Sequence, residues 1–455
     1  MIRVLAPQAA QNGSAIFAPR FEDEFIETAF TDNAGDGTFF EMELIYYPTT
    51  ANAAGYKLPQ PDNVQGLDVS DHGTFKETYR YNFIIKNNRD QDDYGQWMAL
   101  ARPWALTGAA LDAQTQQMMD VDQWLRAYAV LSLAGISDMY TFGNNHNHMT
   151  YIRSDNHKAV YLPWDMDFSF TRGTGATLVG DQNFSKIVNL PGNLRCFYAH
   201  ILDLIETTYN TSYMNYWLVH YGTFAGQNYS GAASYIQTRG AFALSTITTA
   251  GGLNPFTVTA TNVSVTGSNL VVLSGSAPVT AKTIVINGQE YPITWSSLTG
   301  WSIRVPLTTD FTNLSIAAYD AQGRTVTSVV ATATNNFVPA SPVGAIVINE
   351  IMFNASAPGG EYVELFNTSS NTTFDLSDWE LNGLGYTFPG GSYLMPRTFL
   401  ILAKNRSVFA YTYGNAIAVF DEFPGDFQND GETLSLLPNA GYCLLATTNL
   451  PGSVF

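Results

Sequence analysis

The sequence predicts a multidomain protein in which a mixed α+β domain, mainly helical in its second half, is followed by two all-β immunoglobulin-like sandwiches. Its 455 residues leave room for two to four domains of roughly 100 to 200 residues each. Near Gly251 the composition changes, because threonine, valine and serine become dominant and amphipathic stretches containing tryptophan stop. Apolar residues recur every three or four positions before that point, as in helices, and alternate after it, as in strands. We therefore predict domains at 1–250, 254–335 and 345–455.

Four amphipathic segments of the first domain are predicted to be helices. Residues 120–137 place apolar side chains such as Trp124 and Tyr128 on one face, and Asp120 is suited to cap the first turn. The other three segments are 192–208, 213–221 and 231–246. Most of the helix in this domain is therefore expected after Gln91.

The remaining chain has the pattern of two β domains. Residues 256–260 and 283–286 alternate, and Asn287-Gly288 is a hairpin turn signal. A linker at 335–344 contains two prolines, and the alternation resumes at 346–351 and 361–366. Short strands separated by turn signals at this spacing predict sandwiches.

Charge and hydropathy exclude some classes of partner. Acidic residues number 39 and basic residues 21, giving a net charge of −18, so the surface repels nucleic acid and anionic lipid. No run reaches the roughly 18 apolar residues of a membrane span, and the first residues lack the pattern of a signal peptide. We expect no nucleic acid partner and no membrane span, and two unlinked thiols at Cys196 and Cys443 because they fall in different domains.

The segment 136–170 is the strongest candidate for a site. Asp138 follows a predicted helix, a loop rich in asparagine and histidine comes next, and a strand pair is expected at 149–153 and 159–163. The second strand delivers Asp165 and Asp167, whose i, i+2 spacing points both carboxylates the same way. Carboxylates with a nearby asparagine are ligands that a hard cation such as Mg²⁺ accepts.

The same residues can also be interpreted as structural residues of turns and loops. An isolated Asp-x-Asp is usually turn chemistry, but here apolar and aromatic neighbours would leave the pair half-buried, which is costly without a partner. His146 and His148 lack zinc spacing and cysteine partners, so we interpret them as loop hydrogen-bonding residues. Motifs of P-loop, Rossmann and serine-hydrolase sites do not occur in the sequence.

Residues 13–242 resemble the CotH-type (spore coat protein H) kinase family, whose fold is similar to an atypical protein kinase. The resemblance is carried by Asp138, by Asn147, and by 162–168 (Leu-Pro-Trp-Asp-Met-Asp-Phe), with support from 21–26 and 79–83. It implies that Asp138 is the catalytic aspartate, that Asn147, Asp165 and Asp167 bind Mg²⁺ or Mn²⁺, and that ATP is the phosphoryl donor.

The N-terminal lobe of that family is expected to be truncated in this chain. Only about a dozen residues precede the segment that matches, so the lysine that would contact the nucleotide is not located. Lys86 is a nearby cation, which we interpret as a surface group. The lysine that family members often carry after an Asp-Gly pair is absent after Asp36-Gly37.

The last domain resembles the lamin-tail domain, an immunoglobulin-like sandwich. Four blocks carry this resemblance, at 346–354, 361–367, 376–381 and 429–436. In bacterial secreted proteins such a domain accompanies CotH modules as a binding or anchoring unit. Glu350, Glu361 and Glu364 are interpreted as outward-facing strand residues, and Trp379 as a core residue.

Three functions remain open from the sequence. The first is a bacterial extracellular or cell-surface kinase that uses Mg-ATP to phosphorylate serine or threonine of coat or surface proteins, anchored by its β domains, with its signal peptide outside this chain. The second is an inactive surface adhesin or scaffold. The third treats 165–167 as the metal motif of a glycosyltransferase, which would require a parallel nucleotide-binding sheet that the sequence does not predict.

Overall fold

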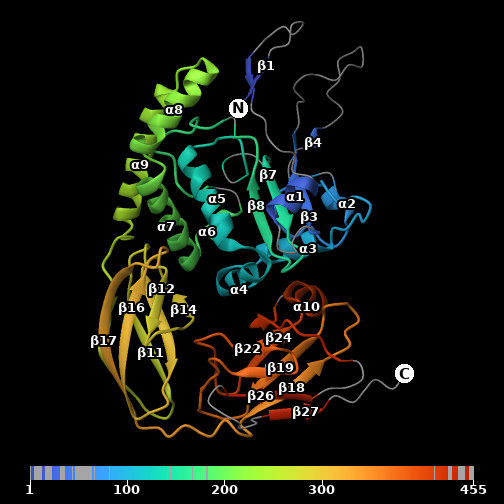
Figure 1. The fold of residues 1–455 in the computed structure, drawn as a ribbon, viewed down its shortest axis with the longest axis vertical. Coiled ribbons are helices and arrows are strands. Elements are labelled where there is room, and N and C mark those ends of the chain that lie inside the picture. Colours follow the sequence, from blue (N-terminus) through green and yellow to red (C-terminus); the bar gives the residue numbers. More distant parts are fainter. Residues whose placement is uncertain are drawn as a thin grey trace. The chain divides into compact units, whose positions relative to one another are not determined.

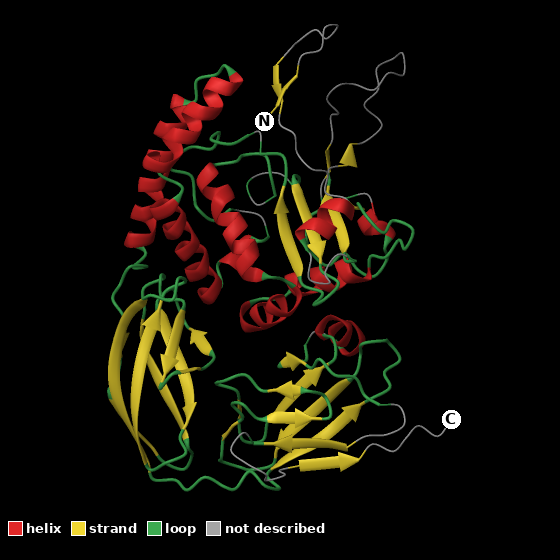
Figure 2. Cartoon of the chain, viewed as in Figure 1, coloured by secondary structure: helices red, strands yellow, loops and turns green. Residues whose placement is uncertain are grey.

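The computed structural model describes residues 2–4, 13–15, 23–30, 36–43, 45–46, 64–65, 67–80, 82–140, 142, 145–166, 168–180, 183–414, 416–428, 433–438 and 446–449. The chain forms two compact units, 1–250 and 251–455. Helices gather in the first unit and strands dominate the second (Figure 1). Figure 2 also shows a short helix, α10 (Arg406–Tyr413), among the strands of the second unit.

The first unit contains a four-stranded sheet with neighbouring strands antiparallel. Its order is β6 (Phe83–Ile85), β3 (Thr38–Met42), β7 (His148–Ile152) and β8 (Ala159–Pro163). The predicted strand pair is therefore confirmed, with β7 starting one residue earlier than expected. Two short pairs complete the described strands of this unit, β1 (Ile2–Val4) with β2 (Gly13–Ala15) and β4 (Ile45–Tyr46) with β5 (Val64–Gln65).

Helices cover both faces of this sheet. Strand alternation puts Phe39 and Tyr151 on one face, where they pack with Ile26 of α1 (Asp23–Ala29). On the opposite face the ring of Phe83 lies 4.4 Å from that of Trp97 in α3 (Gly95–Ala101). Burial on both faces explains why these short strands are so rich in aromatic residues.

Helix α5 (Val121–Ala134) lies against the sheet and begins at the predicted Asp120 cap. The Asp120 carboxylate accepts from the backbone N–H of Gln123 at 3.1 Å, and Gly135 adopts a left-handed conformation. A side chain at Gly135 would also collide with the Tyr235 hydroxyl. The helix therefore ends at Ala134, three residues before the end of the predicted segment.

Hydrogen bonds join α5 to the edge strand β8. The Trp124 indole donates to the carbonyl of Ala159 at 2.8 Å, and the Gln123 amide bonds both the carbonyl and the N–H of Tyr161 at 2.7 and 2.8 Å. These bonds occupy backbone groups of an edge strand that would otherwise need another partner. They fix the helix in register with the sheet.

Helices α7 (Pro191–Thr207) and α9 (Ser230–Thr249) pack against α5. Tyr128 of α5 stacks on Phe197 of α7 with ring centroids 5.2 Å apart. The described helices of this unit also include α2 (Glu77–Arg80), the 3₁₀ helix η1 (Arg102–Ala105), α4 (Gly108–Met118), α6 (Ser185–Val188) and α8 (Thr211–Ala225). The predicted helices at 192–208, 213–221 and 231–246 correspond to α7, α8 and α9. Among the described helices, none has the length and hydrophobicity that would cross a lipid bilayer.

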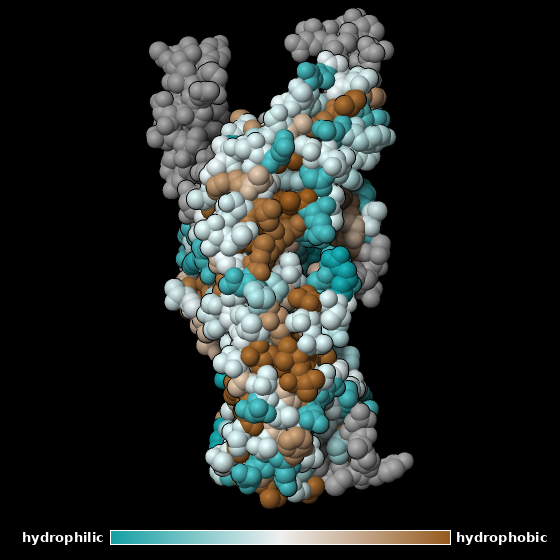
Figure 3. Space-filling model, turned by 90° about the vertical axis from the view of Figure 1, so that its left-hand side faces the viewer, coloured by the Kyte–Doolittle hydropathy of each residue, from teal (hydrophilic) through white to brown (hydrophobic). Residues whose placement is uncertain are grey.

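Helix α8 is longer than predicted because strong caps lie at both ends. The Asn210 side chain accepts from the N–H of Tyr213, and Gly226 ends the helix in a left-handed conformation. One side of α8 packs on α9, while Tyr216 and Val219 stay about two-thirds exposed. Figure 3 looks onto this side and shows hydrophobic residues in separate patches between hydrophilic ones.

The second unit begins with a two-sheet sandwich. One sheet has the order β10-β17-β16-β12-β13 and the other β14-β15-β11-β9. Their inner faces meet around Trp301, which is 1% exposed. Asn287 and Gly288 form the predicted hairpin turn, both with positive φ. The strands are β9 (Thr257–Val258), β10 (Asn262–Val265), β11 (Leu270–Ser276), β12 (Thr283–Ile286), β13 (Gln289–Glu290), β14 (Ile293–Trp295), β15 (Gly300–Pro306), β16 (Phe311–Tyr319) and β17 (Thr325–Asn335).

A second β core follows after residue 345. Its sheets have the orders β18-β19-β24-β25, β22-β21-β26-β27 and β20-β23. Helix α10, capped by Asn405, is a correction to the expected all-β domain: Phe409 is buried against Tyr362. The strands are β18 (Ile346–Met352), β19 (Tyr362–Asn367), β20 (Phe374–Asp375), β21 (Glu380–Asn382), β22 (Tyr386–Thr387), β23 (Tyr393–Leu394), β24 (Phe399–Ala403), β25 (Asp421–Glu422), β26 (Thr433–Leu437) and β27 (Ala446–Asn449).

The predicted fold class is confirmed at the level of a multidomain α+β protein whose helical region precedes many β sheets. The two β cores also touch each other within the second unit. The buried Asn269 side chain donates to the carbonyl of Thr373 at 2.9 Å and accepts from its N–H at 2.8 Å. The two bonds pair the Asn269 amide with both backbone polar groups of Thr373 at this contact.

A buried arginine links α9 to α5. The Arg239 side chain is 0% exposed, and its guanidinium donates to the carbonyls of Ser132, Thr174 and Ala176. Burial lowers the pKa of Arg239. The carbonyl at the C-terminal end of α5 carries the negative end of the helix dipole, which favours a cation there.

We expect Arg239→Met to lower the free energy of unfolding of the first unit by about 3 kcal/mol, because three buried carbonyls would lose their donors. Urea unfolding followed by the helical circular dichroism signal measures this, since most described helices lie in this unit. The matched control is Arg126→Met on α5, whose side chain is 62% exposed, with an expected change within about 0.5 kcal/mol. Equal losses in the two variants would contradict the role given to Arg239.

Candidate functional site

The loop between α5 and β7 carries two of the predicted site residues, Asp138 and Asn147. The Asn147 side-chain amide donates to the backbone carbonyl of Asp138 at 2.7 Å. The N–H of Tyr140 donates to the carbonyl of His146, also at 2.7 Å. These two bonds close the base of the loop, so Asn147 and Asp138 are held together.

Two of the predicted residues have a left-handed backbone. Asn147 has φ +54° and Asp165 has φ +53°. Asparagine and aspartate tolerate this region better than other non-glycine residues, yet it still costs free energy. Asn147 is buried and Asp165, just after β8, is exposed. Two residues of one candidate site therefore have a strained backbone conformation, and functional sites often retain such strain.

The segment after Asp165 is tied to the segment before Asp138. The N–H of Phe170 donates to the carbonyl of Ala134 at 2.7 Å, and the N–H of Arg172 donates to that of Gly135 at 3.0 Å. The hydroxyls of Ser137 and Thr171 share a hydrogen bond of 2.7 Å. The C-terminal end of α5 therefore holds both acidic loops.

His146 pairs with a carboxylate. Its Nδ1 is 3.1 Å from Oε1 of Glu43, which follows β3. The Glu43 carboxylate raises the pKa of His146 against the opposing effect of burial, and the negative charges of Asp138 and Asp165 raise it further. Two of the three predicted acidic residues therefore act electrostatically on this imidazole.

Glu43 was missed by the sequence interpretation, because nothing near it in the chain marks it as a site residue. The signal lies in strand register: Met42 of β3 pairs with His148 of β7. The residue after Met42 therefore comes next to the loop that precedes His148. His146 itself lies in the loop, as interpreted, and its side chain pairs with the carboxylate of Glu43.

Two of the predicted metal ligands carry oxygen atoms of the type that a hard divalent cation accepts. Asp165 offers a carboxylate, and Asn147 keeps its amide oxygen as a ligand atom because its nitrogen bonds the Asp138 carbonyl. Oxygen ligands of this kind suit Mg²⁺ or Mn²⁺. Asp167, the fourth predicted residue, lies outside the described residues, so its part in the set stays a prediction.

Lys86 is half-buried, which corrects its interpretation as a surface group. Its side chain is 25% exposed, and Nζ donates to Oε2 of Glu41 at 2.6 Å. Glu41 lies on β3 and is only 16% exposed. Each charge of this ion pair is compensated by the other, which explains why the two side chains can be half-buried.

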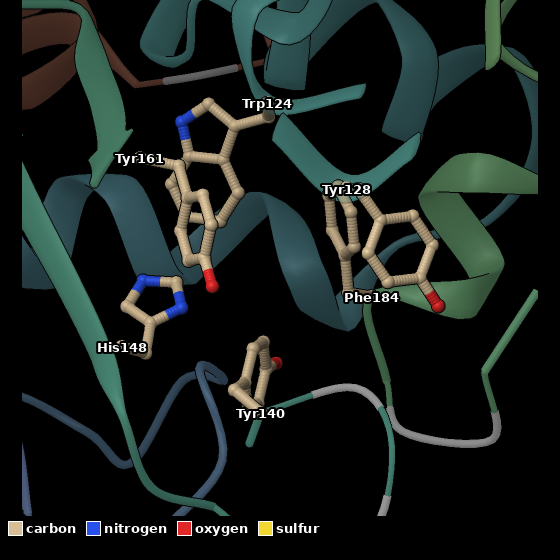
Figure 4. Close-up of a pocket in the computed structure, with 6 residues that line it drawn as sticks. All are labelled: Trp124, Tyr128, Tyr140, His148, Tyr161 and Phe184. Atoms are coloured by element: carbon tan, nitrogen blue, oxygen red, sulfur yellow. The ribbon is translucent and has the colours of Figure 1, made fainter. Parts of the chain in front are cut away.

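His148 is also different from its prediction, since it is a strand residue rather than a loop residue. It is 1% exposed and bonds the Thr150 hydroxyl at 2.6 Å. Burial lowers its pKa to about 3, so the ring is neutral at physiological pH. The ring faces a cavity of about 10 Å³ lined by Trp124, Tyr128, Tyr140, Tyr161 and Phe184 (Figure 4). That volume has room for about one water molecule, so we assign the cavity to the core and not to a ligand.

Two family models match the chain. Residues 38–241 match the model described as CotH kinase protein, and residues 339–443 match the model described as Lamin Tail Domain. The first match contains Asp138, Asn147 and Asp165. Both resemblances seen in the sequence are therefore confirmed by matches to family models.

Other comparisons add little. No curated protein matches the sequence. Among solved structures, the chain is similar to one described as "Bacteroides ovatus mixed-linkage glucan utilization locus (MLGUL) SGBP-B in complex with mixed-linkage heptasaccharide", with 11% identity and a TM-score of 0.13. That match covers 42% of this chain and 52% of the other, so this chain spans about half of that protein. A score this low carries no argument about fold or function.

We expect Glu43→Gln to lower the pKa of His146, because the variant removes the charge and the ionic hydrogen bond that raise it. A raised folded-state pKa means that protonated His146 stabilises the fold below the unfolded value of about 6.5, and that this gain is lost as pH rises through the folded pKa. NMR titration of the imidazole measures the pKa directly.

The matched control for this titration is Glu41→Gln, which removes a carboxylate from the same part of the chain. Glu41 pairs with Lys86, so its loss should leave His146 close to its wild-type titration. An unchanged pKa of His146 in Glu43→Gln would contradict the pairing.

Proposed function

We propose that the chain is an atypical kinase of the bacterial surface or exterior, because residues 38–241 match the CotH kinase protein model and residues 339–443 match the Lamin Tail Domain model. It would transfer the γ-phosphoryl group of Mg-ATP to serine or threonine hydroxyls of coat or surface proteins. The β domains would anchor it or bind its protein partner.

In the proposed reaction, side chains have to orient the acceptor hydroxyl, accept its proton and hold the metal ion. The acceptor hydroxyl oxygen forms a bond to the γ-phosphorus while the bond from that phosphorus to the β–γ bridging oxygen breaks, releasing ADP. Asp138 would orient the hydroxyl and take its proton. Asn147, Asp165 and Asp167 would hold the metal ion, which neutralises charge on the phosphoryl oxygens.

The observation that carries this proposal is the joining of the two acidic loops. The segments that follow Asp165 and precede Asp138 are hydrogen-bonded to each other at the end of α5, and both aspartates act electrostatically on the imidazole of His146. Phosphoryl transfer needs a base for the hydroxyl and a ligand for the metal in one site.

Lys86 is the cation that we propose for the nucleotide phosphates. Protein kinases hold their phosphate-binding lysine in an ion pair with a glutamate, and Lys86 pairs with Glu41. The pair here joins two strands of the sheet, whereas the glutamate of protein kinases lies on a helix.

We expect Mg²⁺ or Mn²⁺ to raise the thermal stability of the chain, because a ligand that binds only the folded state stabilises it. At a metal concentration one hundred times Kd the gain is about 2.7 kcal/mol. Asp165→Asn should remove most of this gain, and differential scanning fluorimetry with and without the metal measures it.

The control for that experiment is Asp378→Asn in the second unit. Asp378 is exposed and has φ +62°, so the change matches Asp165→Asn in charge, exposure and backbone conformation. The metal-induced shift should survive in this variant. A shift that also survives in Asp165→Asn would place the metal elsewhere.

Asp138→Ala should reduce phosphoryl transfer by about 10²- to 10⁴-fold, the usual contribution of a general base. The metal-induced stabilisation should be nearly intact, because Asp138 is not proposed as a ligand. The assay follows label from γ-labelled ATP into the chain itself and into an added serine- and threonine-containing protein.

Two results would contradict the assignment. Transfer that survives Asp138→Ala would remove this residue from the chemistry. Absence of transfer in the wild-type chain, together with a metal shift that depends on Asp165, would support an inactive adhesin or scaffold that kept its cation site.

A further inference from the structure

Three side chains on α5 and α7 meet at one point away from the proposed kinase site. Asp122 lies in the first turn of α5, and Cys196 and His200 lie one turn apart on α7. The Cys196 sulfur is 3.2 Å from Oδ1 of Asp122 and 3.5 Å from Nε2 of His200, and that nitrogen is 3.0 Å from the same carboxylate oxygen. Within the part of the chain that the structure describes, these residues form a cluster of metal-ligating atoms.

The size of this triangle is close to that of a zinc site. Zinc bonds of about 2.3 Å to sulfur, 2.05 Å to nitrogen and 2.1 Å to oxygen at tetrahedral angles place the ligand atoms roughly 3.6 Å (S···N), 3.6 Å (S···O) and 3.4 Å (N···O) apart. The observed distances of 3.5, 3.2 and 3.0 Å are each shorter by no more than about 0.4 Å. A small outward movement of the side chains would complete the geometry.

The orientation of the imidazole distinguishes this cluster from a nucleophilic triad. In a Cys–His–Asp triad the thiol contacts one ring nitrogen and the carboxylate contacts the other. Here Cys196 and Asp122 both face Nε2 of His200. A nitrogen, a sulfur and an oxygen that converge on one another are arranged to share a cation rather than to relay a proton.

Charge and access also favour a divalent ion. Arg126 holds the other oxygen of Asp122, Oδ2, at 2.7 Å, which leaves Oδ1 for the cluster. The side chains of Asp122 and His200 are 38% and 16% exposed, so an ion and a water molecule can reach them from solvent. One carboxylate and one thiolate balance the two charges of Zn²⁺, and the thiol releases its proton on binding.

We propose that Asp122, Cys196 and His200 bind a zinc ion, with a fourth position open to water or another ligand. Both helices that supply the ligands are packed together, as the stacking of Tyr128 on Phe197 shows, so the site is largely pre-formed. It is distinct from the proposed kinase site. Asp122 lies at the start of α5 and Asp138 follows its other end, and a helix of this length is about 20 Å long. A sulfur ligand also selects zinc over the Mg²⁺ proposed there.

Cobalt substitution tests the site in the full chain. Co²⁺ bound to a thiolate gives a sulfur-to-metal charge-transfer absorption, which oxygen ligands cannot give. We expect this absorption in the wild-type chain, its displacement by Zn²⁺, and its loss in Cys196→Ser. His200→Gln and Asp122→Asn should weaken it, and Zn²⁺ should raise the melting temperature of the wild type more than that of these variants.

Matched controls separate this site from others. Cys443→Ser should retain the absorption, which assigns it to Cys196 even if the cluster variants fold poorly, because the chain has two cysteines. His220→Gln, on α8, and Asp165→Asn, in the proposed kinase site, should retain it too. Absence of the absorption in the wild type, or its loss in Cys443→Ser, would overturn the proposal and leave a hydrogen-bonded contact between two helices.

Discussion

The C-terminal end of α5 is the constraint on which the candidate kinase site depends. Its last carbonyls accept hydrogen bonds from Phe170, from Arg172 and from the buried guanidinium of Arg239. A helix end has carbonyls without partners inside the helix, and here two other parts of the chain supply the donors. The same bonds hold the loop after Asp165 next to the loop that starts at Asp138, so a local requirement of helix geometry joins the two segments that carry these aspartates.

Local patterns were sufficient for most of the secondary structure. Helix α5 follows from its apolar period and the Asp120 cap, and the hairpin between β12 and β13 follows from Asn287-Gly288. These features depend on interactions within a few residues, which the sequence displays directly. Asp138 and Asp165 were predicted as site residues for a similar reason, because they follow elements whose ends were marked, and Asn147 was predicted from the family resemblance.

Pairings between distant strands could not be predicted. The contact of Glu43 with His146 depends on the register of β3 against β7, and a shift of one residue would have turned β3 side chains to the opposite face. The ion pair of Lys86 with Glu41 has the same origin. His148 became a buried strand residue because the sheet is covered on both faces, which the polar loop before it did not indicate. Helix α10 was missed because it is a short helix within a strand-rich region.

The two proposed metal sites would share α5, and this has an energetic consequence. Asp122 in its first turn faces α7, while Ala134 and Gly135 at its far end hold the segment 170–172. A cation that binds only the folded arrangement at the first end stabilises the packing of α5 on α7. The same packed helix presents its final carbonyls to Arg239 and Phe170. Binding at either end would therefore stabilise the helix on which the other site is built, and the coupling would be reciprocal because it is a property of one folded state.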